Sequence, residues 1–432
     1  MLKNILMGLG IFAALLAVLI FSGKVPLGSN KANTPAGEVV MWGTLPETSM
    51  NSIVQSFNNQ AKTYRVTYRE VREDVFSQKL LESLANGSGP DLILAPHQII
   101  LSQVSRIYPF PVTSISEKNF KDTFVDGATL FFTPYGAIAL PVSIDPMVLF
   151  YNRTFFSKHG ITNPPVTWDD IANIVPSLTI LDNKNQFIES GIALGSPNLN
   201  YAKDIIMAIV GQLGQVAVLP QFGPNGLVLN VLANTALDSN KNVLPLSTAV
   251  RFFTQFSDYT KNVYSWNQYS PKADDQFVAE KLGMYIGYSS ELNTLRARNN
   301  RGNFEMTYFP QSAGYTSFST GARMYGIATL KTSKNLTAAL NVETQFSSAG
   351  VSPAISAIAG GVPALRAYSN TAGLDTVIAR SMLVARPWYD SFPVESTAQT
   401  ANMISDIVNG RYSVTDASAI FVSRLQDMYT PH

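Results

Sequence analysis

Strand and helix patterns alternate over residues 38–94, and this alternation is the strongest constraint that the sequence places on its fold. The runs Glu38–Trp42, Tyr64–Val71 and Asp91–Leu94 are rich in β-forming residues and read as strands. Between them, two helices are predicted because apolar residues recur at i, i+3, i+4 and i+7. These apolar positions are Met50, Ile53, Val54 and Phe57, then Phe76, Leu80, Leu81 and Leu84. The order predicts a mostly parallel sheet with helices on both faces, whose ligands bind beyond the carboxyl ends of the strands.

Composition narrows the class of protein. A chain of 432 residues corresponds to two or three units of ~150 residues each. Hydrophobic residues make up 46% and charged residues only 14%, which is typical of a globular protein. The net charge of +1 does not indicate the strongly basic surface that binds nucleic acid. The absence of cysteine excludes disulfides, thiolate zinc sites and thiol nucleophiles.

The N-terminus carries an uncharged run, Ile5–Gly23, flanked by Lys3 and Lys24. It is long enough to span ~30 Å of hydrocarbon as a helix. The residues that end it fit a signal-peptide cleavage site poorly, although a cleaved signal remains the alternative. We therefore predict a transmembrane anchor over residues 1–24, followed by a flexible linker over residues 25–37 that is rich in Pro, Gly, Asn and Ser.

The stretch Leu140–Asp170 contains the ordered pattern P-x-x-x-D-x-x-x-L-x-Y-N and then P-P-x-T-W-D-D. From the residues alone it predicts a buried strand, Met147–Tyr151, and a later helix that Thr167 can cap. The ordering resembles the extracellular solute-binding proteins of ABC importers, specifically the maltose-binding-like family. In that family the strand leaving the first lobe crosses here into the second, so the resemblance implies a hinge beside a ligand cleft.

Looser motifs extend the resemblance from about Glu38 to Met428. They are the helix ending A-N-G-S-G-P-D, Gln276–Met284, Thr320–Ile327 and Val408–Met428. The resemblance implies an α/β, two-lobe periplasmic-binding-protein fold of type II, each lobe a mostly parallel sheet flanked by helices. The solute-binding domain would cover residues 38–432, with lobe one at about 38–143 and 285–340 and lobe two at about 144–284 and 341–432. Crossings are expected near Pro141–Ile144, Gly283–Ile286 and the helix around Asn341.

Signatures of catalysis are missing from the sequence. It contains no G-x-S-x-G, S-x-x-K, H-E-x-x-H or P-loop motif. The three histidines, His97, His159 and His432, are far apart, and the carboxylate pairs stand where they would complement helix dipoles. We therefore predict a protein that is not an enzyme and has no metal site and no cofactor. A hydrolase with two distant carboxylates stays a third possibility.

Tyrosine and tryptophan in turn-rich segments are the positive signal for a binding site, because their flat faces pack on the CH-rich face of a pyranose ring. The resemblance places Trp42, Asp145, Tyr288, Tyr325 and Trp388 along the ligand cleft. Thr44 and His97 join them as candidates because they lie on strand-end loops, and Arg323 because it can donate paired hydrogen bonds to hydroxyls. The alternatives are core packing for the aromatic residues, a solvated hinge charge for Asp145, and a structural tie within one lobe for Arg323.

These expectations combine into one functional hypothesis. The chain would be a membrane-tethered, monomeric binding protein that captures a sugar or oligosaccharide outside the cytoplasmic membrane and presents it to ABC permease subunits. The runner-up is an anchored binding protein for another solute, such as a peptide or a glycerophosphodiester, or a sensory receptor without a permease. No nucleic acid partner is expected.

Overall fold

The computed structural model describes residues 37–61, 63–223, 226–236, 243–314 and 318–430. The predicted anchor 1–24, and the predicted linker up to residue 36, lie outside these ranges. Among the residues that are described, no helix is both long enough and apolar enough to cross a membrane.

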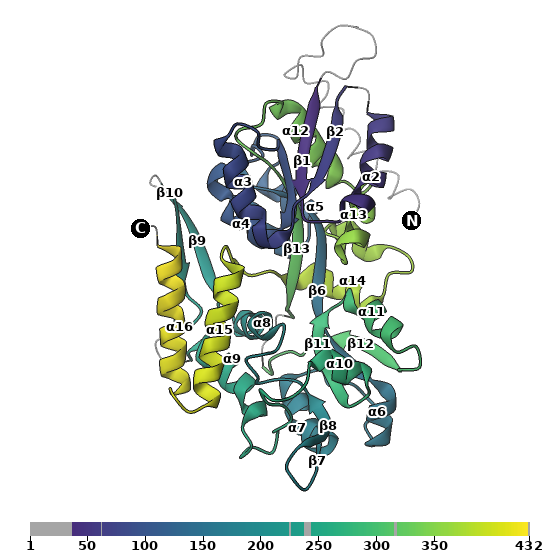
Figure 1. Ribbon diagram of the computed structural model, residues 1–432, viewed down its shortest axis with the longest axis vertical. Coiled ribbons are helices and arrows are strands. Elements are labelled where there is room, and N and C mark those ends of the chain that lie inside the picture. Colours follow the sequence, from purple (N-terminus) through teal and green to yellow (C-terminus); the bar gives the residue numbers. More distant parts are fainter. Residues whose placement is uncertain (1–36, 62, 224–225, 237–242, 315–317, 431–432) are drawn as a thin grey trace.

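One sheet of 11 strands runs through both lobes (Figure 1). Its order is β2-β1-β3-β13-β6-β11-β8-β7, with β12 and β14 paired to β6 and β15 paired to β13. Parallel pairing joins β1 to β2 and β3, and β8 to β11. The sheet is nevertheless mixed, and this corrects the prediction of mostly parallel sheets. The reason is that β6 and β13 run in opposite directions between the lobes, so they pair antiparallel with each other and with several neighbours.

Strand β6 (Leu140–Asn152) is the first crossing between the lobes. Its residues up to Pro146 pair with β13 (Thr320–Thr329) and β14 (Val362–Pro363). From Met147 onward it pairs with β11 and β12 instead. The crossing predicted at Pro141–Ile144 therefore lies within β6, just before its partners change.

We assign lobe one from strand pairing and helix packing around the N-terminal half of β6. It contains β1 (Glu38–Gly43), α2 (Glu47–Gln60), β2 (Arg65–Glu70), η1 (Glu73–Val75), α3 (Phe76–Ala85), β3 (Leu92–Pro96), α4 (His97–Ser102), η2 (Val104–Arg106), α5 (Glu117–Thr123), η3 (Asp126–Phe131), β4 (Phe132–Thr133), β5 (Gly136–Ala137), α12 (Leu336–Phe346), α13 (Ser352–Ala359) and η5 (Arg366–Asn370). Of the predicted core positions, Leu81 on α3 is 52% exposed, since the helix buries only the stripe through Phe76 and Leu80.

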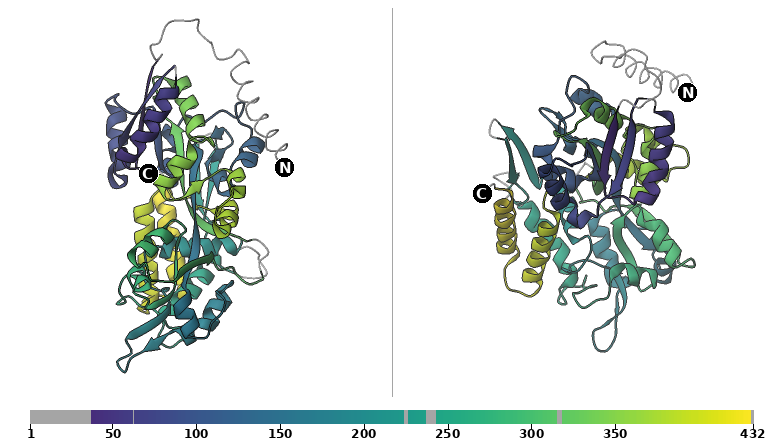
Figure 2. Two further views of the ribbon diagram at one scale, coloured as in Figure 1. Left: turned by 90° about the vertical axis from the view of Figure 1, so that its right-hand side faces the viewer. Right: turned by 45° about the horizontal axis from the view of Figure 1, so that its top comes forward.

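Lobe two is built around the C-terminal half of β6. It contains α6 (Arg153–Lys158), α7 (Trp168–Leu178), β7 (Ile180–Leu181), β8 (Phe187–Ile192), α8 (Ala202–Gln212), β9 (Val218–Gly223), β10 (Gly226–Val231), α9 (Pro245–Thr254), η4 (Gln255–Ser257), α10 (Ala273–Val278), β11 (Leu282–Tyr288), α11 (Glu291–Arg298), β12 (Phe304–Tyr308), α15 (Pro393–Val408) and α16 (Val414–Tyr429). Helices α15 and α16 lie side by side on this lobe in Figures 1 and 2.

Two local predictions are confirmed. Thr167 caps α7 in a capping box with Asp170, whose backbone N–H donates to the threonine side chain. On the C-terminal helix α16, the predicted apolar face faces the core, with Ala417, Phe421 and Leu425 buried. Both features depend only on neighbouring residues, which is why the sequence predicts them.

The lobe division predicted from the sequence is corrected in two stretches. Residues 341–370, expected in lobe two, belong to lobe one with α12, α13 and η5. Residues 285–308 were expected in lobe one, but β11 and β12 pair with the second half of β6 and so belong with lobe two. The predicted crossing at Gly283–Ile286 accordingly lies inside β11, and β13 is the strand that returns to lobe one. These pairings depend on contacts between distant segments, which local patterns do not report.

The third crossing also differs from the prediction. Helix α12, around Asn341, packs on β13 and β6 in lobe one and does not carry the chain across. The chain crosses later, through α14 (Thr376–Val384), β15 (Ala385–Arg386) and the loop that leads to α15. Arg386 pairs with Asp126 of lobe one at 3.3 Å, whereas α15 packs on α8 and α9 of lobe two.

Candidate functional site

Asp145 on β6 and Arg323 on β13 stand opposite each other in the strand register at the junction of the lobes. The Arg323 guanidinium and Asp145 Oδ2 are 3.2 Å apart. Asp145 is only 4% exposed, and it also accepts hydrogen bonds from Ser289 Oγ and from Ser290 N and Oγ at 2.7–3.1 Å. Because its oxygens are occupied in this way, Asp145 acts here as the anchor of Arg323.

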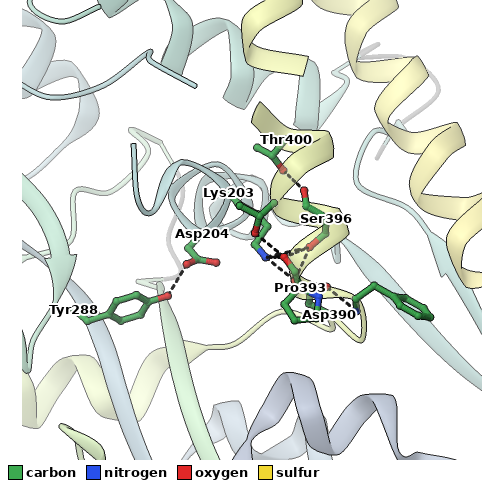
Figure 3. Close-up of polar contacts among 9 residues, drawn as sticks. Lys203, Asp204, Tyr288, Asp390, Pro393, Ser396 and Thr400 are labelled. Carbon is green, nitrogen blue, oxygen red and sulfur yellow. Dashed lines mark hydrogen bonds and ion pairs between the residues drawn. The ribbon is translucent and has the colours of Figure 1, made fainter. Parts of the chain in front are cut away.

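Tyr288, at the end of β11, supports Arg323 from the other side. The guanidinium carbon lies 3.8 Å from the centroid of the Tyr288 ring, a cation–π contact. Tyr201 packs edge-on against the same ring, with centroids 5.0 Å apart. The Tyr288 hydroxyl donates to Asp204 Oδ2 at 2.9 Å (Figure 3). Tyr288 itself is buried, so it holds the arginine in place from beneath.

A hollow of about 170 Å³ opens in front of Arg323. The Arg323 side chain is 43% exposed, which leaves part of its guanidinium facing this space. The lining residues come from lobe one and from the two junction strands, β6 and β13. They are Glu73, Pro96, Gln98, Ser143, Asp145, Arg323, Met324, Tyr325 and Ala359. Pro96 ends β3, so the hollow adjoins the carboxyl end of that strand, where the sequence predicted a ligand.

Three further predicted residues lie close to the hollow. Tyr325 lines it, and Thr44 donates a hydrogen bond from its hydroxyl to the Tyr325 hydroxyl at 3.2 Å. His97 is buried at the start of α4, where its Nδ1 accepts from the backbone N–H of Met324 at 3.4 Å. Burial lowers the pKa of His97 to about 3, so the imidazole is neutral at physiological pH.

The two predicted tryptophans have different surroundings. Trp42, at the end of β1, is buried in the core, and the Arg69 guanidinium carbon lies 5.2 Å from its ring centroid. Trp388 is half-buried in the loop after β15, with Lys203 Nζ 5.5 Å from its ring centroid. The structure thus brings Asp145, Arg323 and Tyr325 to one hollow, and leaves Trp42 outside its lining.

Several residues near the site were not predicted from the sequence. Glu73 and Gln98 line the hollow. Lys203 pairs with Asp390, and Asp204 accepts a hydrogen bond from Tyr288. Lys203 and Asp204 had a usable signal, because two charges begin a helix whose next six residues, 205–210, are all apolar. Such a helix is buried, so its charges must have partners. Glu73 and Gln98 carry no comparable signal.

Burial sets the electrostatics of the group. It raises the pKa of Asp145 above the usual aspartate range, with Arg323 and the two serines acting in the opposite direction. Burial also raises the pKa of Asp204, against the nearby charge of Lys203. Within the described ranges, no three histidine, aspartate or glutamate side chains gather in a way that could hold a metal ion.

A second, smaller hollow of about 90 Å³ lies within lobe two. The loop after β8 and the loop before α10 form it, with Trp266 and Tyr285 in its wall. Tyr201 lines this hollow and also packs against Tyr288 beneath Arg323. Tyr201 therefore connects the wall of the second hollow to the supports of the first.

The sequence profile of bacterial extracellular solute-binding proteins matches residues 52–374. The chain belongs to this family. The family resemblance inferred from the motifs is therefore confirmed. Proteins of Brucella abortus and Brucella suis that are named as binding proteins are 26% identical to this solute-binding protein over 164 residues. That match spans 36% of this chain and 39% of the length of these curated relatives.

Solved structures share the fold over nearly the whole chain. The sugar-binding protein MalE of Xanthomonas citri has a TM-score of 0.72 at 15% identity, covering 91% of this chain and 97% of its own. The cyclic α-maltosyl-1,6-maltose binding protein of Arthrobacter globiformis has a TM-score of 0.71 at 17% identity, with coverage of 91% and 99%. The ABC substrate-binding protein Lmo0181 of Listeria monocytogenes, solved with cycloalternan, has a TM-score of 0.65 at 15% identity, with coverage of 91% and 98%. These likenesses establish the periplasmic-binding-protein fold.

Replacing Trp388 with Ala is expected to weaken solute binding by about 1–3 kcal/mol, the order for burying a large apolar surface. The empty protein should keep nearly all its stability, since Trp388 is half-buried in a loop. Calorimetric titration and the melting transition of the empty protein measure the two effects separately. A stability loss of about 3–5 kcal/mol with unchanged affinity, as for a core tryptophan, would remove Trp388 from the site.

Proposed function

We propose that this protein is a membrane-tethered, extracytoplasmic solute-binding protein that captures a sugar or oligosaccharide between its lobes and delivers it to an ABC importer. The observation that carries the proposal is the Arg323 guanidinium, fixed by Asp145 and Tyr288 at the junction hollow that Tyr325 also lines. A planar guanidinium donates paired hydrogen bonds, and an aromatic face suits the CH-rich side of a sugar ring.

The charges of the hollow support a neutral solute. Arg323 contributes one positive charge, which Asp145 already pairs, and Glu73 adds a further carboxylate to the same lining. An anionic group would meet this acidic surplus, whereas sugar hydroxyls can donate to carboxylates and accept from the guanidinium. The charge balance therefore favours a carbohydrate over a glycerophosphodiester, and sugar-binding structural relatives add support.

Delivery would depend on closure of the lobes. Three chain crossings join them, and a solute that contacts both lobes stabilises the closed arrangement by its differential affinity for that state. The Listeria relative is described as an ABC substrate-binding protein, which supports a permease as the recipient. The mechanism requires no covalent step and no cofactor.

Tethering is proposed from the sequence. The uncharged run Ile5–Gly23 can span a bilayer, and no cysteine is present to carry a lipid anchor. N-terminal sequencing of the protein taken from its native membranes tests this directly. A mature chain that starts after Gly23 would replace the anchor with a cleaved signal peptide.

A thermal-shift screen of the full-length protein in detergent tests the solute class. The panel contains maltotetraose, mannobiose, tagatose, a glycerophosphodiester and a short peptide. A true solute at ~100-fold above its dissociation constant should stabilise the fold by about 2.7 kcal/mol. Stabilisation by the diester or the peptide alone would contradict the carbohydrate proposal, and release of sugar products would favour a hydrolase.

A further inference from the structure

Lys203 is a buried cation in a position that helix formation does not explain. Its side chain is 9% exposed and lies in the first turn of α8. Most other residues of this helix are apolar and buried. A positive charge at a helix N-terminus opposes the helix dipole, and burying an ammonium group is costly unless it is fully paired. The helix would form more readily with an apolar residue at this position.

Among the described residues, the hydrogen bonds of Lys203 Nζ all go to one segment of the chain, Asp390 to Ser396 (Figure 3). Its Nζ donates to Asp390 Oδ2 at 2.8 Å, to the Pro393 carbonyl at 3.1 Å and to Ser396 Oγ at 3.1 Å. These contacts use the three donors of an ammonium group. Asp390 is fully buried, and it also accepts from Ser396 Oγ at 2.8 Å and from the Phe392 backbone N–H at 3.2 Å.

The segment that Lys203 holds is the third crossing between the lobes. It begins beside lobe one, where Arg386 pairs with Asp126, and it ends in α15 on lobe two. Trp388 stands in its middle, two residues before Asp390. The ammonium group of Lys203 therefore contacts the loop at Asp390 and lies 5.5 Å from the Trp388 ring centroid.

A buried ion pair contributes little net stability compared with a well-packed apolar pair, so its value lies in the geometry that it imposes. We propose that Lys203 is a positioning residue for solute binding, which fixes the loop carrying Trp388 through its ion pair with Asp390. The inference rests on the proposed function, in which Trp388 contacts the solute.

The test compares Lys203→Met with the double variant Lys203→Met/Asp390→Asn, in the full-length protein in detergent. Lys121→Met is the matched control, because Lys121 forms an exposed pair with Glu117 in lobe one. Hydrogen exchange of the amides of residues 388–392 reports loop order, and titration with maltotetraose reports binding. Unfolding by denaturant gives the stability of each variant.

Lys203→Met should speed exchange in residues 388–392 by about 10-fold or more and weaken maltotetraose binding by a similar factor, the order for losing a charged hydrogen bond. The control should leave both unchanged. The double variant removes the unpaired Asp390 charge that the single variant leaves, so part of the stability should recover while loop exchange and affinity stay impaired. A double variant with wild-type exchange and wild-type affinity would overturn the inference, because the pair would then serve stability alone.

The two proposals fail in different ways. If the wild-type protein does not bind maltotetraose, loop exchange still decides whether Lys203 orders the Trp388 loop, and faster exchange in both variants supports that role. If the wild-type protein binds maltotetraose and the variants match it in exchange and affinity, the inference about Lys203 is contradicted and the proposed function stands.

Discussion

Replacing Arg323 with Ala is expected to reduce the affinity for the solute by about 1.5–3 kcal/mol, the usual contribution of hydrogen bonds to a charged group. The solute loses a fixed planar donor. Asp145, left as a buried carboxylate without its cation, instead lowers the stability of the fold. Isothermal titration with the solute identified by the screen measures the effect.

Two variants control this experiment. Arg298→Ala removes the same charge from α11, where Arg298 pairs with Asp274 and Asp275 at the surface, and should leave affinity unchanged. Arg323→Lys keeps the charge but loses the planar fork and the stacking on Tyr288, so it should restore only part of the affinity. Wild-type affinity in Arg323→Ala would exclude Arg323 from the site.

Replacing Glu343 with Gln is expected to remove a large pH dependence from the stability of lobe one. Glu343 on α12 is buried, and Thr329 Oγ1 donates to its Oε2 at 2.6 Å. Burial raises the pKa of Glu343 to about 8, whereas a glutamate in an unfolded chain titrates near ~4.3. Between these values the folded protein keeps a proton that the unfolded chain has released.

The direction in which stability changes with pH follows from this difference in bound protons. The stabilising contribution is fully present below pH ~4.3 and is lost as pH rises through about 8, by at most ~1.4 kcal/mol per pH unit. Urea unfolding of the wild-type protein and of Glu343→Gln, from pH 5 to pH 9, should show their difference in unfolding free energy changing by roughly 3–5 kcal/mol.

An exposed glutamate provides the comparison for this measurement. Glu395→Gln, in the first turn of α15, should follow the wild-type curve, since its side chain is exposed to solvent. A difference between wild type and Glu343→Gln that stays constant with pH would show that Glu343 is ionised in the folded protein. Ionisation would require a rearranged junction between Thr329 and α12.

Local interactions explain what could be predicted of the fold. The strands and helices of residues 38–94, the Thr167 cap and the buried face of α16 follow from spacing and residue type within a few turns. The ordered motifs around Leu140–Asp170 were enough to identify the family. Leu81 was misplaced because an amphipathic pattern gives the side of the buried stripe but not its width.

The candidate site was predictable only as a set of positions. Asp145, Arg323, Tyr325 and Trp388 were expected at the cleft, and their proposed contacts with solute stay predictions. Burial decides which residues can face a solute. Asp145 and Tyr288 are buried and hold Arg323 in place, whereas the Arg323 side chain is partly exposed. A sequence gives a side chain's chemistry, but its exposure depends on what the rest of the chain packs against it.

The sequence by itself determined the order of strands and helices in residues 38–94, the Thr167 cap, the family and the first crossing between the lobes. The tertiary structure alone decided that β11 and β12 join lobe two, that the third crossing follows α14, and that Lys203 holds Asp390 across 187 residues of sequence. The physical reason is that periodicity records whether a face is buried, whereas strand pairing and ion pairing depend on which distant segment covers it.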